Sequence, residues 1–328
     1  MDDAHKHFNK SLEMYQRIHG TDSNHEDIAD LLLDMGSHCE SNSDHSTALE
    51  YKLNALDMYR EVYGKDACLA DIATTLHNIG VSYESMNEYV NAEEYCTQAL
   101  TMYRKIYYGE ECNRNDIANT LKCLGYVKRQ LKMIDEAEKL YQDLLHMYRQ
   151  IYRPDLKHKD TADLLLNMGS NCESNSDHIT ALENRLRSLD IYREVYGKEA
   201  CHADITRALH NIGVSYESMN EYVTAEEYYT QALTMYRKVY AEESNRKDIA
   251  LTLRCLGDVK RKLKMYDKAE QLYHESLRMY RQIYGSDSNH EDIANLLLDM
   301  GSHCESNSDH STALEYKLRA LDMYREVY

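Results

Sequence analysis

Residues 71–103 read DIATTLHNIGVSYESMNEYVNAEEYCTQALTMY, a pattern that predicts two helices joined by a short turn. In the first half, apolar residues recur at three- and four-residue steps, the spacing of one helix face, at Ile72, Leu76, Ile79 and Tyr83. The second half has a comparable apolar face at Ala92, Cys96, Ala99 and Tyr103. Ser85 and Asn87 lie between the halves and mark a polar turn. The stretch is therefore predicted to be a helical hairpin with one apolar face on each helix.

The same hairpin recurs along the chain with a period of 44 residues, one interval being 45. Each copy of the first helix contains a glycine, at Gly36, Gly80, Gly125, Gly169, Gly213, Gly257 and Gly301. An alanine follows twelve residues after each glycine, at Ala48, Ala92, Ala137, Ala181, Ala225, Ala269 and Ala313. Small residues at fixed helical offsets let two helices approach closely. Packing between the two helices of a repeat therefore explains the period.

The repeats fix the expected boundaries. First helices are expected near 25–41, 69–86, 114–130, 158–174, 202–218, 246–262 and 290–306, and second helices near 44–63, 88–107, 133–152, 177–196, 221–240, 265–284 and 309–328. A lone helix at 2–19 precedes them. Ser23 with Glu26, and Ser288 with Glu291, have capping-box spacing at the start of a first helix. Residues 1–328 are predicted to form a single solenoid, with repeats near 25–63, 69–107, 114–152, 158–196, 202–240, 246–284 and 290–328.

A longer period is superimposed on the repeats. Residues 20–63 and 285–328 differ at three places only, Thr21/Ser286, Asp30/Asn295 and Asn54/Arg319. Three repeat types, which we name X, Y and Z, follow one another as X-Y-Z-X-Y-Z-X, starting with the X repeat near 25–63. This near-identity indicates duplication of three-repeat blocks. Both ends of the chain interrupt the repeat pattern, so we expect it to belong to a longer array or a larger protein.

At these positions the sequence resembles the tetratricopeptide repeat family. Its pattern of large and small residues is matched at Leu76, Gly80, Tyr83, Tyr89, Ala92 and Ala99. The usual unit has about 34 residues, whereas these longer repeats are similar to those of kinesin light chains and nephrocystin-like proteins. The resemblance implies an all-α, right-handed superhelical solenoid of antiparallel helix pairs with about 15 helices. It also implies a concave groove, lined by the first helices, that holds a peptide or a partner helix.

The composition excludes several classes of function. The chain has 38 basic and 56 acidic residues and a formal net charge of −18, which argues against binding to nucleic acid or to an anionic membrane. No apolar run approaches the roughly 20 residues of a membrane span. The nine cysteines, an odd number spread over the repeats, favour reduced thiols and a cytoplasmic location.

Two basic first helices stand out in this acidic chain, those of the third and sixth repeats. By analogy with the family, eight residues are expected to face the groove: His77, Asn78, Lys122, Arg129, His210, Asn211, Arg254 and Arg261. Arginine and lysine in a groove suit an acidic or phosphorylated segment. The alternative is that these cations form ordinary solvated faces paired with acidic neighbours such as Glu84 and Glu217. Block duplication is a further explanation for the two basic helices. If the sixth repeat is a copy of the third, it is basic by inheritance and not because of a function.

Metal, cofactor and catalytic sites are not predicted. The adjacent pairs His38-Cys39 and His303-Cys304 lack the further ligands at zinc-site spacing, and no phosphate-binding glycine loop or nucleophile motif is present. We therefore expect a non-enzymatic scaffold or adaptor that binds protein or peptide ligands. Two alternatives stay open: the ligand-sensing array of a larger nucleotide-switch protein, and the substrate-recognition arm of an enzyme. End-to-end self-association through the last helix is also expected to be possible, because nothing in the sequence caps that helix.

Overall fold

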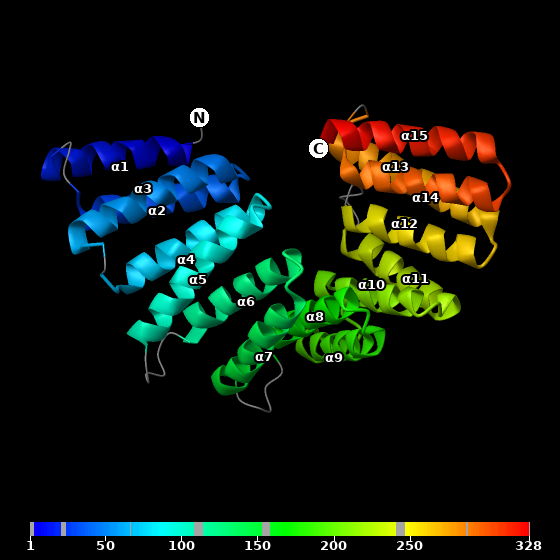
Figure 1. Cartoon of the computed structure of the whole chain (residues 1–328), viewed down its shortest axis with the longest axis horizontal. Coiled ribbons are helices and arrows are strands. Elements are labelled where there is room, and N and C mark those ends of the chain that lie inside the picture. Colours follow the sequence, from blue (N-terminus) through cyan, green and yellow to red (C-terminus); the bar gives the residue numbers. More distant parts are fainter. Residues whose placement is uncertain are drawn as a thin grey trace. The chain divides into compact units, whose positions relative to one another are not determined.

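The computed structural model describes residues 3–20, 24–65, 67–107, 114–152, 158–240, 247–286 and 288–327. Within these ranges the chain contains fifteen α-helices and no strand. Figure 1 shows how these helices follow one another along the chain. The predicted all-helical repeat fold is therefore confirmed. The helices group into two compact units, unit 1 from Met1 to Leu156 and unit 2 from Lys157 to Tyr328. The continuity of one solenoid over residues 1–328 stays a prediction.

Each unit alternates first and second helices. Unit 1 contains α1 (Asp3–His19), α2 (Glu26–Ser41), α3 (His45–Tyr63), α4 (Ala70–Ser85), α5 (Tyr89–Ile106), α6 (Arg114–Gln130) and α7 (Ile134–Ile151). Unit 2 contains α8 (Lys159–Ser174), α9 (His178–Tyr196), α10 (Ala203–Ser218), α11 (Tyr222–Val239), α12 (Lys247–Lys262), α13 (Tyr266–Tyr284), α14 (Glu291–Ser306) and α15 (His310–Val327). The helix α1 packs on α2, and every later first helix packs on the second helix that follows it.

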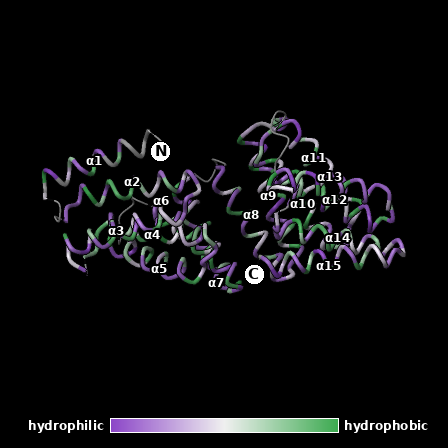
Figure 2. Tube along the Cα trace, turned by 90° about the horizontal axis from the view of Figure 1, so that it is seen from above, coloured by the Kyte–Doolittle hydropathy of each residue, from purple (hydrophilic) through white to green (hydrophobic). Residues whose placement is uncertain are grey.

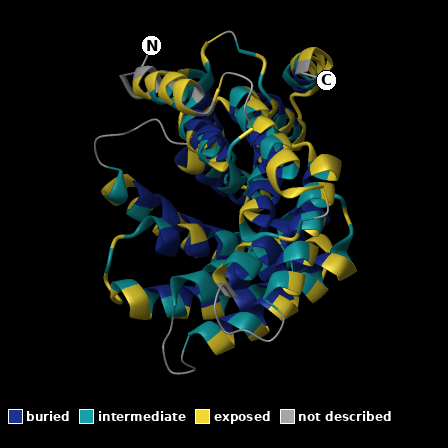
Figure 3. Cartoon of the chain, turned by 90° about the vertical axis from the view of Figure 1, so that its left-hand side faces the viewer, coloured by how far each residue is buried: buried dark blue, intermediate teal, exposed yellow. Residues whose placement is uncertain are grey.

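The glycine of each first helix lies against the second helix of the same repeat. A Cβ atom at Gly213 would lie 2.7 Å from ring carbons of Tyr229, and one at Gly80 would lie 2.4 Å from Sγ of Cys96. Such distances are too short for real contacts, so glycine is required there. Along the helices of Figure 2 hydrophobic and hydrophilic residues alternate. Figure 3 shows that buried residues gather where helices face one another.

The turn inside each repeat has one backbone geometry that the sequence did not predict. In every turn, the residue two positions before the second helix has a positive φ near 60°. These residues are Ser43, Asn87, Lys132, Ser176, Asn220, Lys264 and Ser308. In the first turn the N–H of Asp44 donates to the carbonyl of Cys39 at 2.9 Å, and that of Ser43 donates to Glu40 at 2.9 Å. This is the hydrogen-bond pattern that usually ends a helix at glycine. Here non-glycine residues adopt the left-handed conformation.

The predicted capping boxes are not the caps that the structure shows. Ser23 lies outside the described residues, and the N-cap of α14 is His290 rather than Ser288. Nδ1 of His290 accepts from the N–H of Asp292 at 3.1 Å. His25, His158 and His202 cap their helices in the same way. A histidine ring nitrogen thus replaces the serine oxygen, because it too can accept from an unpaired N–H at a helix start.

A cation is buried between the X and Y repeats of each unit. Lys52 of α3 is 1% exposed, and its ammonium group donates to Glu40 at 2.6 Å and to Ser82 at 2.8 Å. In unit 2 Arg185 of α9 is equally buried and donates to Glu173 at 2.8 Å and to Ser215. Each contact set joins an X repeat to the first helix of the following Y repeat. These cations therefore hold neighbouring first helices in place.

The last X repeat has almost the same sequence around its lysine, with Arg319 in place of Asn54, but a different environment. Lys317 is 37% exposed and pairs with Glu305 at 2.5 Å. Leu321 is 44% exposed, whereas the equivalent Leu56 in the first X repeat is 2% exposed. The helix α4 packs on α3, whereas on α15 the leucines Leu314, Leu318 and Leu321 are exposed. Figure 3 shows many exposed residues in the helix beside the C-terminus. The burial of the lysine is therefore set by the helix that covers it.

This pair gives a matched test of the buried contact. Lys52→Ala is expected to lower the free energy of unfolding by about 3–5 kcal/mol, because it breaks a buried ion pair. Lys317→Ala is expected to change it by about 0–1 kcal/mol, because the pair is exposed. Urea unfolding followed by circular dichroism measures both changes. Equal losses for the two variants would contradict the assignment of Lys52 as a buried structural cation.

Candidate binding surface on the first helices

The eight predicted groove residues lie on four first helices. His77 and Asn78 belong to α4 and Lys122 and Arg129 to α6, both in unit 1, whereas the equivalent residues of unit 2 are His210 and Asn211 of α10 and Arg254 and Arg261 of α12. In each unit the two first helices contact each other. The structure thus brings the residues of each unit onto adjacent helices, and their predicted contact with a ligand stays a prediction.

The two histidines link neighbouring first helices. Nδ1 of His77 lies 3.2 Å from the hydroxyl of Thr120, and Nδ1 of His210 lies 3.0 Å from that of Thr252. Burial, and then the positive charge of a nearby cation, lowers the pKa of each ring to about 4. His210 is only 8% exposed. A neutral ring bonded to the next repeat suits a structural role better than contact with an anion.

In unit 2 each predicted arginine has a carboxylate partner within the chain. Nε of Arg254 donates to Asp299 of α14, and the guanidinium of Arg261 donates to Oδ1 of Asp258 at 2.7 Å. The hydroxyl of Tyr273 also donates to Asp258, at 2.9 Å. All these side chains are at least half-buried. An acidic ligand at this surface would therefore compete with two carboxylates of the protein itself.

Unit 1 differs from unit 2 at one decisive position. Tyr126 stands where the later block has Asp258, and Arg129 lies over its ring, 5.1 Å from the centroid. Lys122 lies close enough to Glu84 to lower the pKa of that carboxyl, although burial has the larger effect and raises it. The surface of α4 and α6 thus has two cations, one carboxylate and an aromatic face. Its balance of charge favours an anionic partner more than the surface of α10 and α12 does.

Some of the other basic residues on these two first helices make contacts between repeats. Lys128 of α6 donates to Glu93 of α5 at 2.6 Å and pairs with Glu136 of α7 at 2.6 Å. Lys260 of α12 contacts Glu226 of α11 in the same way. Both lysines are buried. Because residues at different positions of a helical turn point in different directions, some basic residues of α6 and α12 face inward and others face the surface. The net charge of the helix does not reveal this division.

Sequence reasoning did not single out the half-buried Glu217 as part of a carboxyl cluster. The hydroxyl of Tyr229 donates to it at 2.7 Å. Burial raises its pKa to about 7; the Tyr229 hydrogen bond opposes this shift, and the charges of Asp258 and Asp299 add to it. In unit 1 the equivalent Glu84 instead accepts from Sγ of Cys123 at 3.1 Å. The exchange of Tyr229 for Cys96 between the blocks is the signal that could have revealed this difference.

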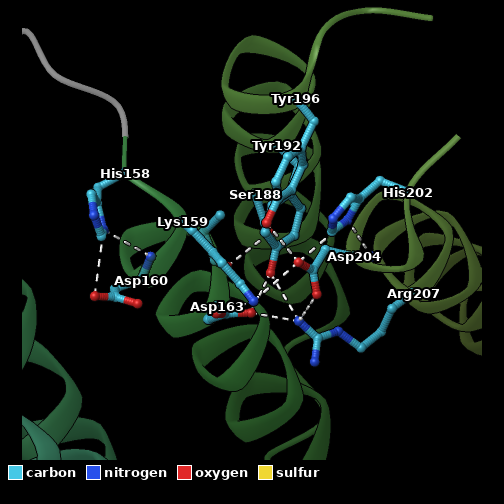
Figure 4. A network of polar contacts seen from close by, with 11 residues as sticks. His158, Lys159, Asp160, Asp163, Ser188, Tyr192, Tyr196, His202, Asp204 and Arg207 are labelled. Atoms are coloured by element: carbon cyan, nitrogen blue, oxygen red, sulfur yellow. Dashed lines mark hydrogen bonds and ion pairs between the residues drawn. The ribbon is translucent and has the colours of Figure 1, made fainter. Parts of the chain in front are cut away.

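A second polar network lies at the start of α8 and α10 and is drawn in Figure 4. The ammonium group of Lys159 lies 3.1 Å from Asp204, and the guanidinium of Arg207 lies 2.5 Å from Asp163 and 3.0 Å from Asp204. The hydroxyl of Tyr192 donates to Asp163 at 2.5 Å.

Each charge in this network faces an opposite charge. Tyr196 donates to Asp204 at 2.8 Å, and the ring of His202 stacks on Tyr196 with 3.6 Å between centroids. Burial raises the pKa of the Tyr196 hydroxyl to about 12, and the hydrogen bond to Asp204 adds to the shift. Such a satisfied set ties the X repeat to the Y repeat and gives no activated nucleophile. Among the described residues, no cluster of three or more metal-binding side chains is found.

These features define a helical-repeat protein whose neighbouring repeats share hydrophobic cores and are also linked by polar contacts. A family model described as tetratricopeptide repeat matches residues 27–105, 160–238 and 248–326, which is more than half of the chain. The chain therefore belongs to the tetratricopeptide repeat family. A comparison with curated protein sequences found no match. Within the part of the chain that the structure describes, no helix is long and apolar enough to cross a bilayer.

Several solved structures share the fold at low sequence identity. The quorum sensor NprR from B. thuringiensis has a TM-score of 0.72 and 17% identity, with 96% of this chain and 81% of that chain covered. A putative kinesin light chain from Podospora anserina, with nearly identical repeats, has a TM-score of 0.54 and 12% identity, covering 66% of this chain and 98% of that one. The third structure is a signal transduction ATPase with numerous domains from Pyrococcus horikoshii, which has a tetratricopeptide repeat sensor. Its TM-score is 0.66 and its sequence identity 13%, with 96% of this chain and 45% of that chain covered. These similarities show the fold.

The raised pKa of Glu217 makes a prediction about stability and pH. An unfolded glutamate titrates near 4.5, so between pH 4.5 and 7 the unfolded chain releases a proton that the folded chain retains. Stability is therefore expected to fall as the pH rises through this window, by up to about 3 kcal/mol. The Glu217→Gln variant is expected to lack this loss, and Glu183→Gln, at an exposed site of α9, to retain it. The midpoints of urea unfolding, measured between pH 4 and 8, test this prediction. If the midpoints of wild type and Glu217→Gln change with pH in parallel, the raised pKa of Glu217 is refuted.

Proposed function

We propose that this chain is a protein-binding scaffold and that α4 and α6 hold an acidic segment of its partner. The fold is one that serves protein–protein interaction. The observation that carries the site is the charge of the surface in unit 1. There Lys122 and Arg129 meet Glu84 and the ring of Tyr126, with no counterpart to Asp258 at that position.

An acidic side chain of the partner would approach Arg129 along the face of Tyr126. A guanidinium stacked on an aromatic ring keeps its N–H groups at the ring edge for a carboxylate or phosphate. The ring thus orients Arg129 without neutralising it. Asn78 lies on the neighbouring helix, where its side chain could bond the ligand's backbone. His77 would support this surface by fixing α4 to α6 through Thr120.

The corresponding surface of unit 2 is proposed as a weaker site. A ligand that binds Arg254 and Arg261 there would displace Asp299 and Asp258, which are half-buried and would each lose an arginine partner. Leaving such carboxylates unpaired costs free energy that a ligand contact must first offset. Asn211 and the buried His210 belong to this surface, with the histidine acting through Thr252.

A sensing role within a larger protein is a second candidate. The solved ATPase from Pyrococcus horikoshii has a tetratricopeptide repeat sensor, and this chain resembles 45% of that chain. A ligand that binds the first helices would serve a scaffold and a sensor equally well. The domains that accompany this chain distinguish the two, because the sensor of a nucleotide-switch protein shares its polypeptide with a phosphate-binding loop. The experiment below tests the binding site that both share.

A peptide-library selection at moderate salt tests the proposal. Wild-type protein is expected to enrich peptides rich in aspartate and glutamate, and Lys122→Gln/Arg129→Gln to bind them at least about tenfold more weakly, because charge-assisted bonds are lost. Arg254→Gln/Arg261→Gln is expected to retain most of the binding. Lys139→Gln, on the exposed side of α7, is the control for loss of charge alone. If no acidic peptide is enriched, or if all variants bind alike, the proposed site is wrong.

A further inference from the structure

A pocket of about 370 Å³ opens on the second-helix side of the Y repeat in unit 1. Its lining includes Arg60 from α3, Cys68 from the following loop, Leu76 from α4, and Thr101, Met102 and Lys105 from α5. Leu76 is buried and forms the floor, whereas Cys68 and Lys105 are exposed at the rim. None of the four proposed groove residues of α4 and α6 lines this pocket, so it is a different site from the binding surface described above.

The Y repeat of unit 2 has the same pocket at equivalent residues. Its volume is about 250 Å³, and its lining includes Arg193, Cys201, Leu209, Thr234, Met235 and Lys238. Each of these residues is identical to its counterpart in the first pocket. The two units thus present two copies of one pocket, each formed inside its own unit.

The rim of the pocket is specific to Y repeats. At the position of Lys105 and Lys238, the X repeats have a glutamate, at Glu61, Glu194 and Glu326. At the position of Thr101 and Thr234, the X repeats have an aspartate, at Asp57, Asp190 and Asp322. In place of Cys68 the first X repeat has Asn24, whose amide donates to Glu61. The fold therefore accepts an acidic pair on this face, and the cation of the Y repeat is not needed to complete the helix end.

All the charged residues that line the two pockets are basic, although the chain has a net charge of −18. In unit 1 these are Arg60, Lys65 and Lys105. In unit 2 they are Arg193 and Lys238. Both pockets thus have an arginine and a lysine beside an apolar floor, which match an anionic side chain with an aliphatic neighbour.

We propose that each Y pocket binds an acidic segment of a partner protein, with a carboxylate between the arginine and the lysine and an aliphatic side chain on the leucine and methionine floor. The hydroxyl groups of Thr101 and Thr234 do not compete for this role as donors. Thr101 donates to the carbonyl of Thr97 at 2.8 Å, and Thr234 donates to that of Thr230 at 2.8 Å. The cations that the two pockets share are Arg60 with Lys105 and Arg193 with Lys238, and two such groups suit the two oxygens of a carboxylate.

The exposed thiols at the rim allow a direct test by reversible tethering. Two peptides that differ only in glutamate or glutamine next to a leucine each carry a disulfide to a small thiol. The protein thiolate attacks this disulfide, forms a mixed disulfide with the peptide and releases the small thiol, so no net oxidation occurs. Mass spectrometry then measures how much of each peptide is attached at Cys68 and Cys201 at equilibrium. The glutamate peptide is expected to exceed the glutamine peptide about tenfold at both sites.

Matched variants come from the X repeats themselves. Thr101→Asp/Lys105→Glu and Thr234→Asp/Lys238→Glu place the X-repeat residues at the rim and are expected to abolish or reverse the preference. Asn24→Cys puts a thiol at the equivalent place of the first X repeat, beside Glu61, and is expected to favour the glutamine peptide. Circular dichroism checks that each variant is folded.

Four results would overturn the proposal. Equal capture of both peptides by the wild-type protein excludes recognition of the carboxylate. A preference that survives in the X-type variants assigns it to charges outside the pocket. A phosphoserine peptide captured about tenfold better than the glutamate peptide makes the site a phosphate site. Dimerisation in sedimentation experiments that the X-type variants abolish identifies the occupant as a second copy of this chain.

Discussion

The rest of the structure depends on a cation buried between repeats. Lys52 in unit 1 and Arg185 in unit 2 each connect a glutamate of the X repeat to a serine of the next Y repeat. A helix packs by its apolar stripe, which tolerates rotation and sliding, whereas a buried ion pair requires particular atoms to meet. The first helices of successive repeats are consequently held in one register. The surface of α4 and the pocket beside α5 both depend on that register.

Charge in this chain therefore has two uses that a count of residues does not separate. Lys128 and Lys260 hold Z repeats to Y repeats, and Arg254 and Arg261 meet Asp299 and Asp258. Among the described residues, Lys122 and Arg129 lie on the surface of α4 and α6, and the lysine of each Y pocket lies in a lining whose charged residues are all basic. An acidic protein can in this way keep a few sites that attract anions while its overall charge limits nonspecific association.

The sequence predicted the helices well because the period, the glycines and the alanines reflect local packing. The requirement for Gly213 beside Tyr229, for example, is visible in the period alone. Histidine caps such as His290 and left-handed turn residues such as Lys132 were missed, because residues of other types usually occupy those positions. The residues of the candidate site were predicted from the sequence, but the side chains that they contact were not. That Arg254 meets Asp299, 45 residues later, depends on how successive repeats stack.

The exposed face of α15 has a consequence for how the chain folds. Residues 285–328 are almost identical to residues 20–63, yet the face that α4 covers on α3 is open on α15. Nothing in the X repeat itself can distinguish the Y helix that follows it from a Y helix of a neighbouring molecule. During refolding at high concentration, α4 or α10 of one molecule can therefore dock on α15 of another before its own partner is reached. Near-identical repeats thus make exchange between molecules a competing folding route, which a dilute solution or synthesis from one end of the chain would suppress.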